Sequence, residues 1–169
     1  MVEIISITSG KGGVGKTTIT ANLSAALSEI GKNVVAIDAN FTTPNLGLFL
    51  GVYLHEVTIH VVLAGRGELK KSIYFHPLGF KIICGSLNVN DLENVNPEIF
   101  LNIPKSFENS DFVLIDTAAG LGREAIYGLK ASEKVIIVTT PDIASLMDAY
   151  RVSKIAEDLG KEIIGIILN

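Results

Sequence analysis

The sequence predicts an α/β fold in which a doubly wound, mostly parallel sheet carries helices on both of its faces. Short apolar stretches alternate along the chain with longer stretches whose apolar residues recur at helical spacing, which is typical of such sheets. Most of the short stretches are apolar throughout, as expected of strands buried on both faces. The 169 residues are 48% hydrophobic, so we assign residues 1–169 to a single domain with one core.

Six strands are predicted. The first is rich in β-branched residues, and most of the others are apolar over their whole length. In chain order the strands are Glu3–Ser9, Asn33–Asp38, Lys81–Cys84, Phe112–Asp116, Lys134–Thr139 and Glu162–Leu168.

Between the strands, apolar residues at helical spacing predict four helices and one shorter helix. The helices are Thr17–Ile30, Thr58–Leu63, Pro97–Asn109, Arg123–Ala131 and Ile143–Leu159. In the last helix the larger apolar residues form one stripe, which we expect to face the core. The stripe consists of Ile143, Leu146, Met147, Tyr150, Ile155 and Leu159.

A glycine-rich loop lies between the first strand and the first helix and predicts a phosphate-binding site of the P-loop type. Its glycines allow successive backbone N–H groups to turn inward and form an anion-binding nest at a helix N-terminus. Lys16 is expected to reach the β- and γ-phosphates, and the hydroxyl of Thr17 to ligate Mg²⁺. The predicted nucleotide-binding residues are Gly10, Lys11, Gly12, Gly13, Val14, Gly15, Lys16, Thr17 and Thr18.

The same glycines also have the spacing of a dinucleotide-binding loop. Gly10, Gly12 and Gly15 fit that pattern, and an acid that would bind a ribose, Asp38, follows at the end of the next strand. A dinucleotide site, however, has no use for a lysine and a threonine directly after its last glycine. A purely structural glycine turn explains neither Lys16 nor Lys11, so we favour the phosphate loop.

Two predicted strands end in aspartate, at the edge of the sheet where parallel sheets bind ligands. Asp116 beside a phosphate loop is expected to hold Mg²⁺ through water molecules. Asp38 is expected to orient or polarise the attacking water, since a second carboxylate there is useful only if a nucleophile must be positioned. We therefore place Thr17, Asp38 and Asp116 around the metal. The alternative for each acid is a turn-capping role.

Lys11 is a second lysine within the loop. The nest and Lys16 already serve the phosphates of their own site, whereas an ammonium group at position 11 could reach a partner's site across a two-fold axis. There it would supply the charge that an arginine finger supplies in other enzymes, which contributes about 10³ to 10⁵ in rate. The alternative is a solvated loop lysine. The predicted catalytic residues are Lys11, Lys16 and Asp38.

Composition limits the remaining classes of function. The net charge of −4 gives no general attraction to nucleic acid, and DNA binding is not expected. Cys84 stands alone in an apolar stretch, which excludes an intrachain disulfide and a cysteine-built metal cluster within one chain. The first residues do not have the pattern of a signal peptide, and no apolar run approaches 18 residues, so we expect a cytoplasmic protein.

The stretch Lys11–Thr18 resembles the deviant Walker A motif of the MinD/ParA family of ATPases, and the resemblance is strongest to the MinD branch. It extends along the chain through Val34–Asp38, Asn45–Leu48, Val113–Gly120, Thr139–Pro141, Ser145–Tyr150 and Gly165–Asn169. The resemblance implies binding of ATP or ADP with Mg²⁺, and an ATP-dependent homodimer in which Lys11 enters the partner's site. It further implies that Gly120 belongs to a switch loop, that Asn45 lies near the dimer face and that Asn169 contacts adenine.

The sequence departs from the family pattern at three places. Asn40 stands where family members often have a second aspartate, and Ala118 replaces the usual proline after the fourth strand. The sequence stops at Asn169, whereas family members continue through further strands, an adenine-covering loop and, in the MinD branch, a membrane-binding helix. We therefore expect either a C-terminally truncated form or a short variant of the family. Attachment to the inner face of a membrane is expected only through a helix outside these residues.

The favoured function is a nucleotide-timed switch: an ATPase, slow and stimulated by a protein regulator, that resembles MinD-type proteins of division-site placement or spatial positioning. Two alternatives stay open, a ParA-like DNA or plasmid partitioning ATPase and a nucleotide-binding module with little catalysis. Asn40 and Ala118 make the second of these worth testing. The redox branch of the superfamily needs paired cysteines at a dimer face and is excluded by the single Cys84. The sequence does not indicate a cargo.

Overall fold

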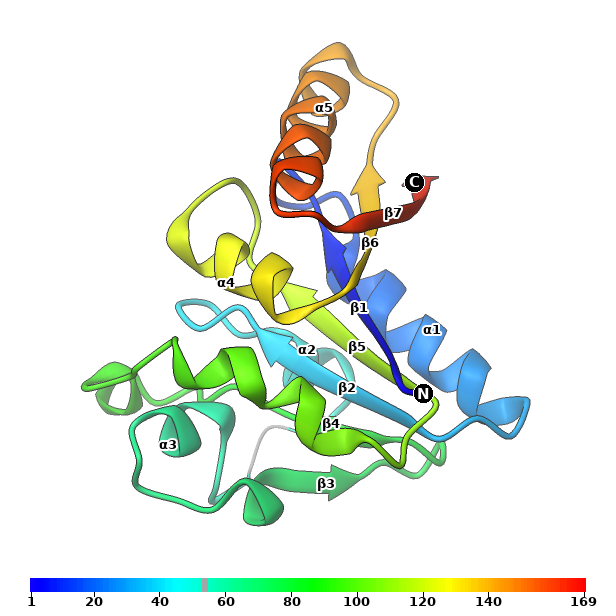
Figure 1. Cartoon of the computed structure of the whole chain (residues 1–169). Coiled ribbons are helices and arrows are strands. Elements are labelled where there is room, and N and C mark those ends of the chain that lie inside the picture. The colour runs from blue at the N-terminus through cyan, green and yellow to red at the C-terminus, as the bar shows by residue number, and fades with distance from the viewer. Residues whose placement is uncertain (53–54) are drawn as a thin grey trace.

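The computed structural model describes residues 1–52 and 55–169, and it confirms the doubly wound α/β fold. Within these residues one seven-stranded sheet has the order β3-β4-β2-β5-β1-β6-β7 (Figure 1). The strands are β1 (Glu3–Thr8), β2 (Val34–Ala39), β3 (Ile73–Phe75), β4 (Lys81–Ile83), β5 (Phe112–Thr117), β6 (Lys134–Thr139) and β7 (Glu162–Leu168). Each predicted strand is present, with ends that differ by no more than one residue.

All neighbouring strands run parallel except β3, which pairs antiparallel with β4 at one edge of the sheet. Strand β3 was not predicted, because its three residues are too few to show a pattern. At the centre, β5 lies between β2 and β1, and its register sets Asp116 opposite Asp38 on β2 and opposite Ile7 on β1. This register brings the two strand-end acids to the point where the phosphate loop leaves β1.

Helices cover both faces of the sheet (Figure 1). They are α1 (Lys16–Glu29), α2 (Leu46–Phe49), α3 (Ile59–Leu63), α4 (Arg123–Ala131) and α5 (Ile143–Asp158). Helices α1 and α2 pack on one face, where Ala21 and Leu46 contact the inner side chains of the central strands. Helices α3, α4 and α5 cover the opposite face. The burial of apolar area on both faces is the main stabilising contribution to this arrangement.

The predicted helix Pro97–Asn109 is wrong in type. The structure has two short 3-10 helices there, Ile99–Asn102 and Pro104–Phe107. Pro104 has no N–H to donate, so the hydrogen-bond ladder of an α-helix is interrupted there. The apolar spacing nonetheless marked residues that face the core, because Phe100 and Ile103 are buried there.

The apolar stripe predicted to bury α5 is also wrong in its N-terminal half. Ile143 and Tyr150 are 83% and 58% exposed. The helix instead buries small and medium side chains that also recur at helical spacing, namely Ser145, Ala149, Val152 and Ala156. Small residues let the helix axis approach β6 closely, so the larger side chains are left facing outward.

None of the helices in the described ranges is long and apolar enough to cross a membrane.

Candidate functional site

The glycine loop connects β1 to α1 and has the backbone that a phosphate nest requires. Gly13 and Gly15 have φ values of 78° and 99°, a region that side-chain-bearing residues rarely adopt. Helix α1 begins at Lys16, and no described side chain caps its first turn. The N–H groups of that turn are therefore available to an anion, and the helix dipole adds partial positive charge.

Two loop glycines are also required by packing. A Cβ at Gly10 would stand 2.5 Å from the Cβ of Asp148 on α5, and 2.6 Å from that residue's backbone. A Cβ at Gly15 would stand 2.5 Å from the side-chain nitrogen of Asn169. The loop is thus held between α5 and the end of β7.

A cavity of about 620 Å³ lies beside the loop. Seven predicted residues line it: Gly12, Gly13, Gly15, Lys16, Thr17, Thr18 and Asn45. The residues of the opposite wall were not predicted as site residues; they include Asn40, Thr43, Leu48, Phe49, Ala119 and Glu124. Most of these residues follow the carboxyl ends of β2 and β5. Parallel sheets bind ligands at that edge, and the same observation that predicted Asp38 and Asp116 could have predicted these residues.

Lys16 is buried, with only 8% of its surface exposed. Burial lowers the pKa of its ammonium group, and the negative charge of Asp116 acts in the opposite direction. A buried cation at the foot of a glycine nest is suited to an anionic ligand, because ligand charge would replace the hydration that burial removes.

Thr17 lines the cavity and is bonded to Asp116, which is 1% exposed and does not line it. The Thr17 hydroxyl donates a hydrogen bond of 2.7 Å to Asp116 Oδ2, and Thr20 approaches Oδ1 at 3.4 Å. A hydroxyl and a carboxylate are oxygen donors of the kind that Mg²⁺ prefers. Together with the buried lysine and the glycine nest, this donor set fits a magnesium-bound phosphate group.

Asp38 lies opposite Asp116 in the strand register and is 1% exposed. Its Oδ1 accepts the backbone N–H of Asn40 and its Oδ2 that of Leu46, both at 3.0 Å. The carboxylate therefore holds both ends of the segment 40–45, which we call the β2 loop. Through these two hydrogen bonds, the buried Asp38 fixes the backbone of the loop that forms one wall of the cavity.

Burial, and then the charge of Asp116, raise the pKa of Asp38 to about 8, although the N–H bonds of the β2 loop oppose this shift. Burial also raises the pKa of Asp116, to about 6, while Thr17 and Lys16 oppose the shift. Two carboxylates placed this way repel each other when both are charged, and a cation between them would relieve the repulsion.

These pKa values predict that the nucleotide-free chain loses stability as the pH rises. An unfolded aspartate is ionised above about pH 4, whereas folded Asp38 and Asp116 keep their protons to about pH 8 and 6. The folded state binds more protons in this window, so the free energy of unfolding should fall by at least about 2 kcal/mol between pH 5 and pH 8. Denaturant unfolding at several pH values measures this change in the free energy of unfolding. Asp38→Asn should flatten the slope, and a stability that rises over this window would contradict the prediction.

Lys11 lies outside the cavity lining. Its side chain is 52% exposed, and its Nζ is 3.9 Å from Oδ1 of Asp142, the residue that caps α5. Hydrogen bonds from Ser145 hold the pKa of Asp142 well below its usual range, so this carboxylate stays charged. The exposed contact is weak, and Lys11 is free to exchange it for another anion.

The remaining predicted residues surround the loop without lining the cavity. Val14 is buried in the core beneath α1, and its carbonyl accepts a 3.0 Å hydrogen bond from Asn169. Gly120 has φ 84° and donates its N–H to the Ser9 carbonyl at the start of the loop. The contact of Asn169 with adenine and the switch role of Gly120 stay predictions.

Replacing Lys16 with alanine is expected to weaken nucleotide binding by at least about 100-fold, because it removes the one buried cation from the cavity wall described above. Calorimetric titration with ADP and Mg²⁺ measures the loss. Lys32→Ala removes an equal charge from an exposed turn and is the matched control. Equal affinity in the two variants would contradict the assignment.

The comparisons with known proteins agree with this geometry. Residues 5–169 match the CobQ/CobB/MinD/ParA nucleotide binding domain. An uncharacterised ATP-binding protein of Methanocaldococcus jannaschii is 37% identical over 170 residues, covering all of this chain and 64% of its own length. The chain thus spans about two thirds of that relative.

Two solved structures share the fold. The septum site-determining protein MinD of Pyrococcus horikoshii, complexed with Mg-ADP, has a TM-score of 0.96 and 42% identity, over 100% of this chain and 70% of that chain. A MinC:MinD cell division protein complex of Aquifex aeolicus has a TM-score of 0.84 and 32% identity, over 98% and 68%. The sheet, the glycine loop and these matches together show that the chain belongs to the CobQ/CobB/MinD/ParA family of nucleotide-binding domains.

Proposed function

We propose that this chain binds ATP with Mg²⁺ and hydrolyses it as a molecular switch, pairing with a second copy while ATP is bound. The observation that carries the proposal is the cavity lined by the glycine nest, buried Lys16 and Thr17, whose hydroxyl is bonded to Asp116. The MinD relative that was solved with Mg-ADP has the same fold at 42% identity, which supports the choice of nucleotide and metal.

Each residue has a role that its position allows. The nest and Lys16 bind and orient the phosphates, and Thr17 and Asp116 hold the metal. When bound, Mg²⁺ offsets the negative charge that develops on the phosphate oxygens. Asp38 orients the attacking water from the base of the β2 loop, and its hydrogen bonds keep that loop against the cavity.

The position of Lys11 is an argument for the proposed dimer. It is half-exposed, lies outside its own cavity and has only a weak contact with Asp142. Exposed apolar side chains lie on several elements at the same end of the sheet: Leu48, Phe49, Leu121, Ile143, Leu146 and Met147. A second copy facing this end would cover them and bring its own Lys11 toward this cavity.

Multiple-turnover ATP hydrolysis and light-scattering mass measurement test the proposal together. We expect slow phosphate release that depends on Mg²⁺, and a doubled mass with a non-hydrolysable ATP analogue but not with ADP. An analogue that binds without doubling the mass would contradict the dimer, and the absence of nucleotide binding would contradict the whole proposal.

A nucleotide-binding module with little catalysis is the second candidate. Asp38 favours it, because both of its oxygens accept backbone N–H groups and its surface is almost fully buried. Under this candidate ATP and ADP bind, but no phosphate appears over many multiples of the enzyme concentration. The turnover measurement above therefore separates the two.

The cellular surface on which the switch acts is a further part of the proposal. The MinC:MinD relative supports a protein regulator, and the negative net charge gives no general attraction to DNA, so we place the switch in the cytoplasm, at a membrane rather than on DNA. Hydrolysis by the full-length protein, measured with anionic lipid vesicles and with duplex DNA, tests this choice. Stimulation by vesicles alone is expected, and stimulation by DNA alone would favour the ParA-like alternative.

A further inference from the structure

His60 is a fully buried histidine outside the cavity, on helix α3. Its Nδ1 accepts the backbone N–H of Ser86 at 2.9 Å, and its Nε2 lies 2.7 Å from the carbonyl oxygen of Phe41. Since a backbone N–H can only donate, Nδ1 must be unprotonated and the ring proton must be on Nε2, which donates to Phe41. Both ring nitrogens of a neutral imidazole are therefore occupied.

The partner of Nε2 belongs to the β2 loop, whose Asn40, Thr43 and Asn45 line the nucleotide cavity. Phe41 is the inward-facing residue of that loop, 4% exposed, and its ring packs edge-on against both His60 and Phe100. The loop is thus fixed at its ends by Asp38 and in its interior by His60. Neither anchor lines the cavity, and His60 acts on it only through the loop.

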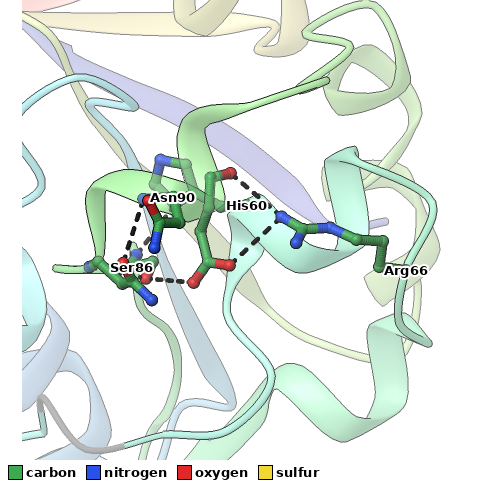
Figure 2. Close-up of polar contacts among 6 residues, drawn as sticks. His60, Arg66, Ser86 and Asn90 are labelled. Atoms are coloured by element: carbon green, nitrogen blue, oxygen red, sulfur yellow. Dashed lines mark hydrogen bonds and ion pairs between the residues drawn. The ribbon is translucent and has the colours of Figure 1, made fainter.

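The partner of Nδ1 belongs to a second segment, residues 85–91, which is itself held by polar contacts (Figure 2). The Ser86 hydroxyl donates to Asp91 Oδ2 at 2.7 Å, and Arg66 reaches Oδ1 of the same carboxylate at 3.3 Å. Asn88 and Asn90 add turn hydrogen bonds. The segment is therefore a fixed support against which His60 can hold the β2 loop.

Gly85 gives a second, independent contact between the two segments. A Cβ at this position would stand 2.2 Å from the Cβ of Pro44 in the β2 loop and 3.3 Å from His60 Cε1. Neither the proline ring nor the buried imidazole can move aside without moving the loop. The close approach at Gly85 and the hydrogen bond at His60 thus fix the same stretch of backbone from the same side.

We propose that His60, supported by segment 85–91, is a positioning residue for ATP hydrolysis: it sets the β2 loop, and through it Asp38, in the arrangement that turnover requires. The inference rests on the proposed function. Because the loop works with Asp38 on the hydrolytic step, His60 should affect kcat far more than the affinity for ADP.

Two substitutions separate the hydrogen bonds of His60. The side-chain nitrogen of glutamine lies where Nε2 lies in histidine, so His60→Gln can still donate to Phe41. The side-chain oxygen of asparagine lies where Nδ1 lies, so His60→Asn can still accept from Ser86 but leaves the Phe41 carbonyl without its donor. We expect kcat to fall about tenfold in His60→Asn, while KM for ATP and the Kd for ADP change less than about twofold. His60→Gln should keep kcat within about twofold of the unsubstituted chain.

His76 offers a matched control. Its Nε2 also meets a backbone carbonyl, that of Leu50 at 3.1 Å, and its Nδ1 also accepts a backbone N–H, that of Leu78 at 3.2 Å. Both partners lie outside the β2 loop. His76→Asn should therefore lower thermal stability without the kcat effect.

Gly85→Ala tests the inference without touching His60, and it replaces His60→Asn if that variant does not fold. Gly85→Ala should lower kcat at least as much as His60→Asn does, while the affinity for ADP stays unchanged. Equal kcat in His60→Asn and His60→Gln, or an ADP affinity that falls in step with kcat, would overturn the positioning role. An unsubstituted chain that binds ADP but does not hydrolyse ATP would instead overturn the proposed function, and the positioning role with it.

Discussion

Replacing Lys11 with alanine is expected to leave ADP affinity within about twofold while lowering ATP turnover by about 10³-fold and removing the ATP-induced dimer. Affinity is kept because Lys11 does not line the cavity of its own chain, where Lys16 supplies the buried positive charge. Turnover is lost because, under the proposed function, the Lys11 ammonium supplies transition-state charge to the partner's site.

The decisive measurement is a mixing experiment. Lys11→Ala is combined with Lys16→Ala, which lacks binding in its own site but retains its own Lys11. If Lys11 acts across the interface, a mixed pair holds one complete site, formed by the cavity of the first variant and the lysine of the second, and mixing should restore part of the turnover. Lys11→Arg, which keeps the charge, and Lys32→Ala, which removes a charge from an exposed turn, are the controls.

Two outcomes would contradict the cross-site role. Normal turnover in Lys11→Ala would make Lys11 the solvated loop lysine that its 52% exposure also permits. Lost turnover with no recovery on mixing would place its action within its own chain. Since the contact with Asp142 is long and exposed, Asp142→Ala should leave ADP affinity unchanged and isolates the effect of that pairing.

The elements that the sequence predicted best are those in which one physical requirement dominates. A central parallel strand such as β5 is buried on both faces, so its apolar run identifies it without reference to the rest of the chain. The glycine loop is equally local, because positive φ at Gly13 and Gly15 and a lysine after the last glycine are properties of consecutive residues. The fold class and the phosphate site follow from such features.

The parts that the sequence did not predict depend on contacts between distant residues. The large apolar residues of α5 resemble a core stripe in isolation, but the small residues at Ala149 and Ala156 fit the surface of β6 more closely. His60 carries no signal of its own, because its role depends on Phe41 and Ser86, which lie 19 and 26 residues away. Periodicity and motifs do not encode such pairings.

Asp38→Ala is expected to keep ATP binding, lower turnover by at least about 100-fold and accumulate the ATP-bound dimer. Binding should survive because Lys16, Thr17 and Asp116 remain in place, and Asp38 is buried below the cavity rather than exposed within it. Removing the carboxylate takes away the group that, under the proposed function, orients the water. It also leaves the N–H groups of Asn40 and Leu46 without their acceptor, which loosens the β2 loop.

These two consequences can be separated by a second substitution. Asp38→Asn retains one side-chain oxygen, so it can still accept one of the two backbone N–H groups, but it carries no charge and cannot accept a proton from water. If orientation of the water dominates, both variants should lose turnover equally. If the hold on the β2 loop dominates, Asp38→Asn should recover much of it.

Asp111→Ala is the matched control for Asp38. Asp111 also accepts a backbone N–H beside β2, that of Asn33 at 2.8 Å, but it is exposed and precedes β5, at the opposite end of that strand from Asp116. Single-turnover and multiple-turnover phosphate release, with mass measurement in ATP, compare the three variants. A trapped dimer in Asp38→Ala together with normal behaviour in Asp111→Ala supports the assignment. Normal hydrolysis in Asp38→Ala would show that the water is positioned without this side chain.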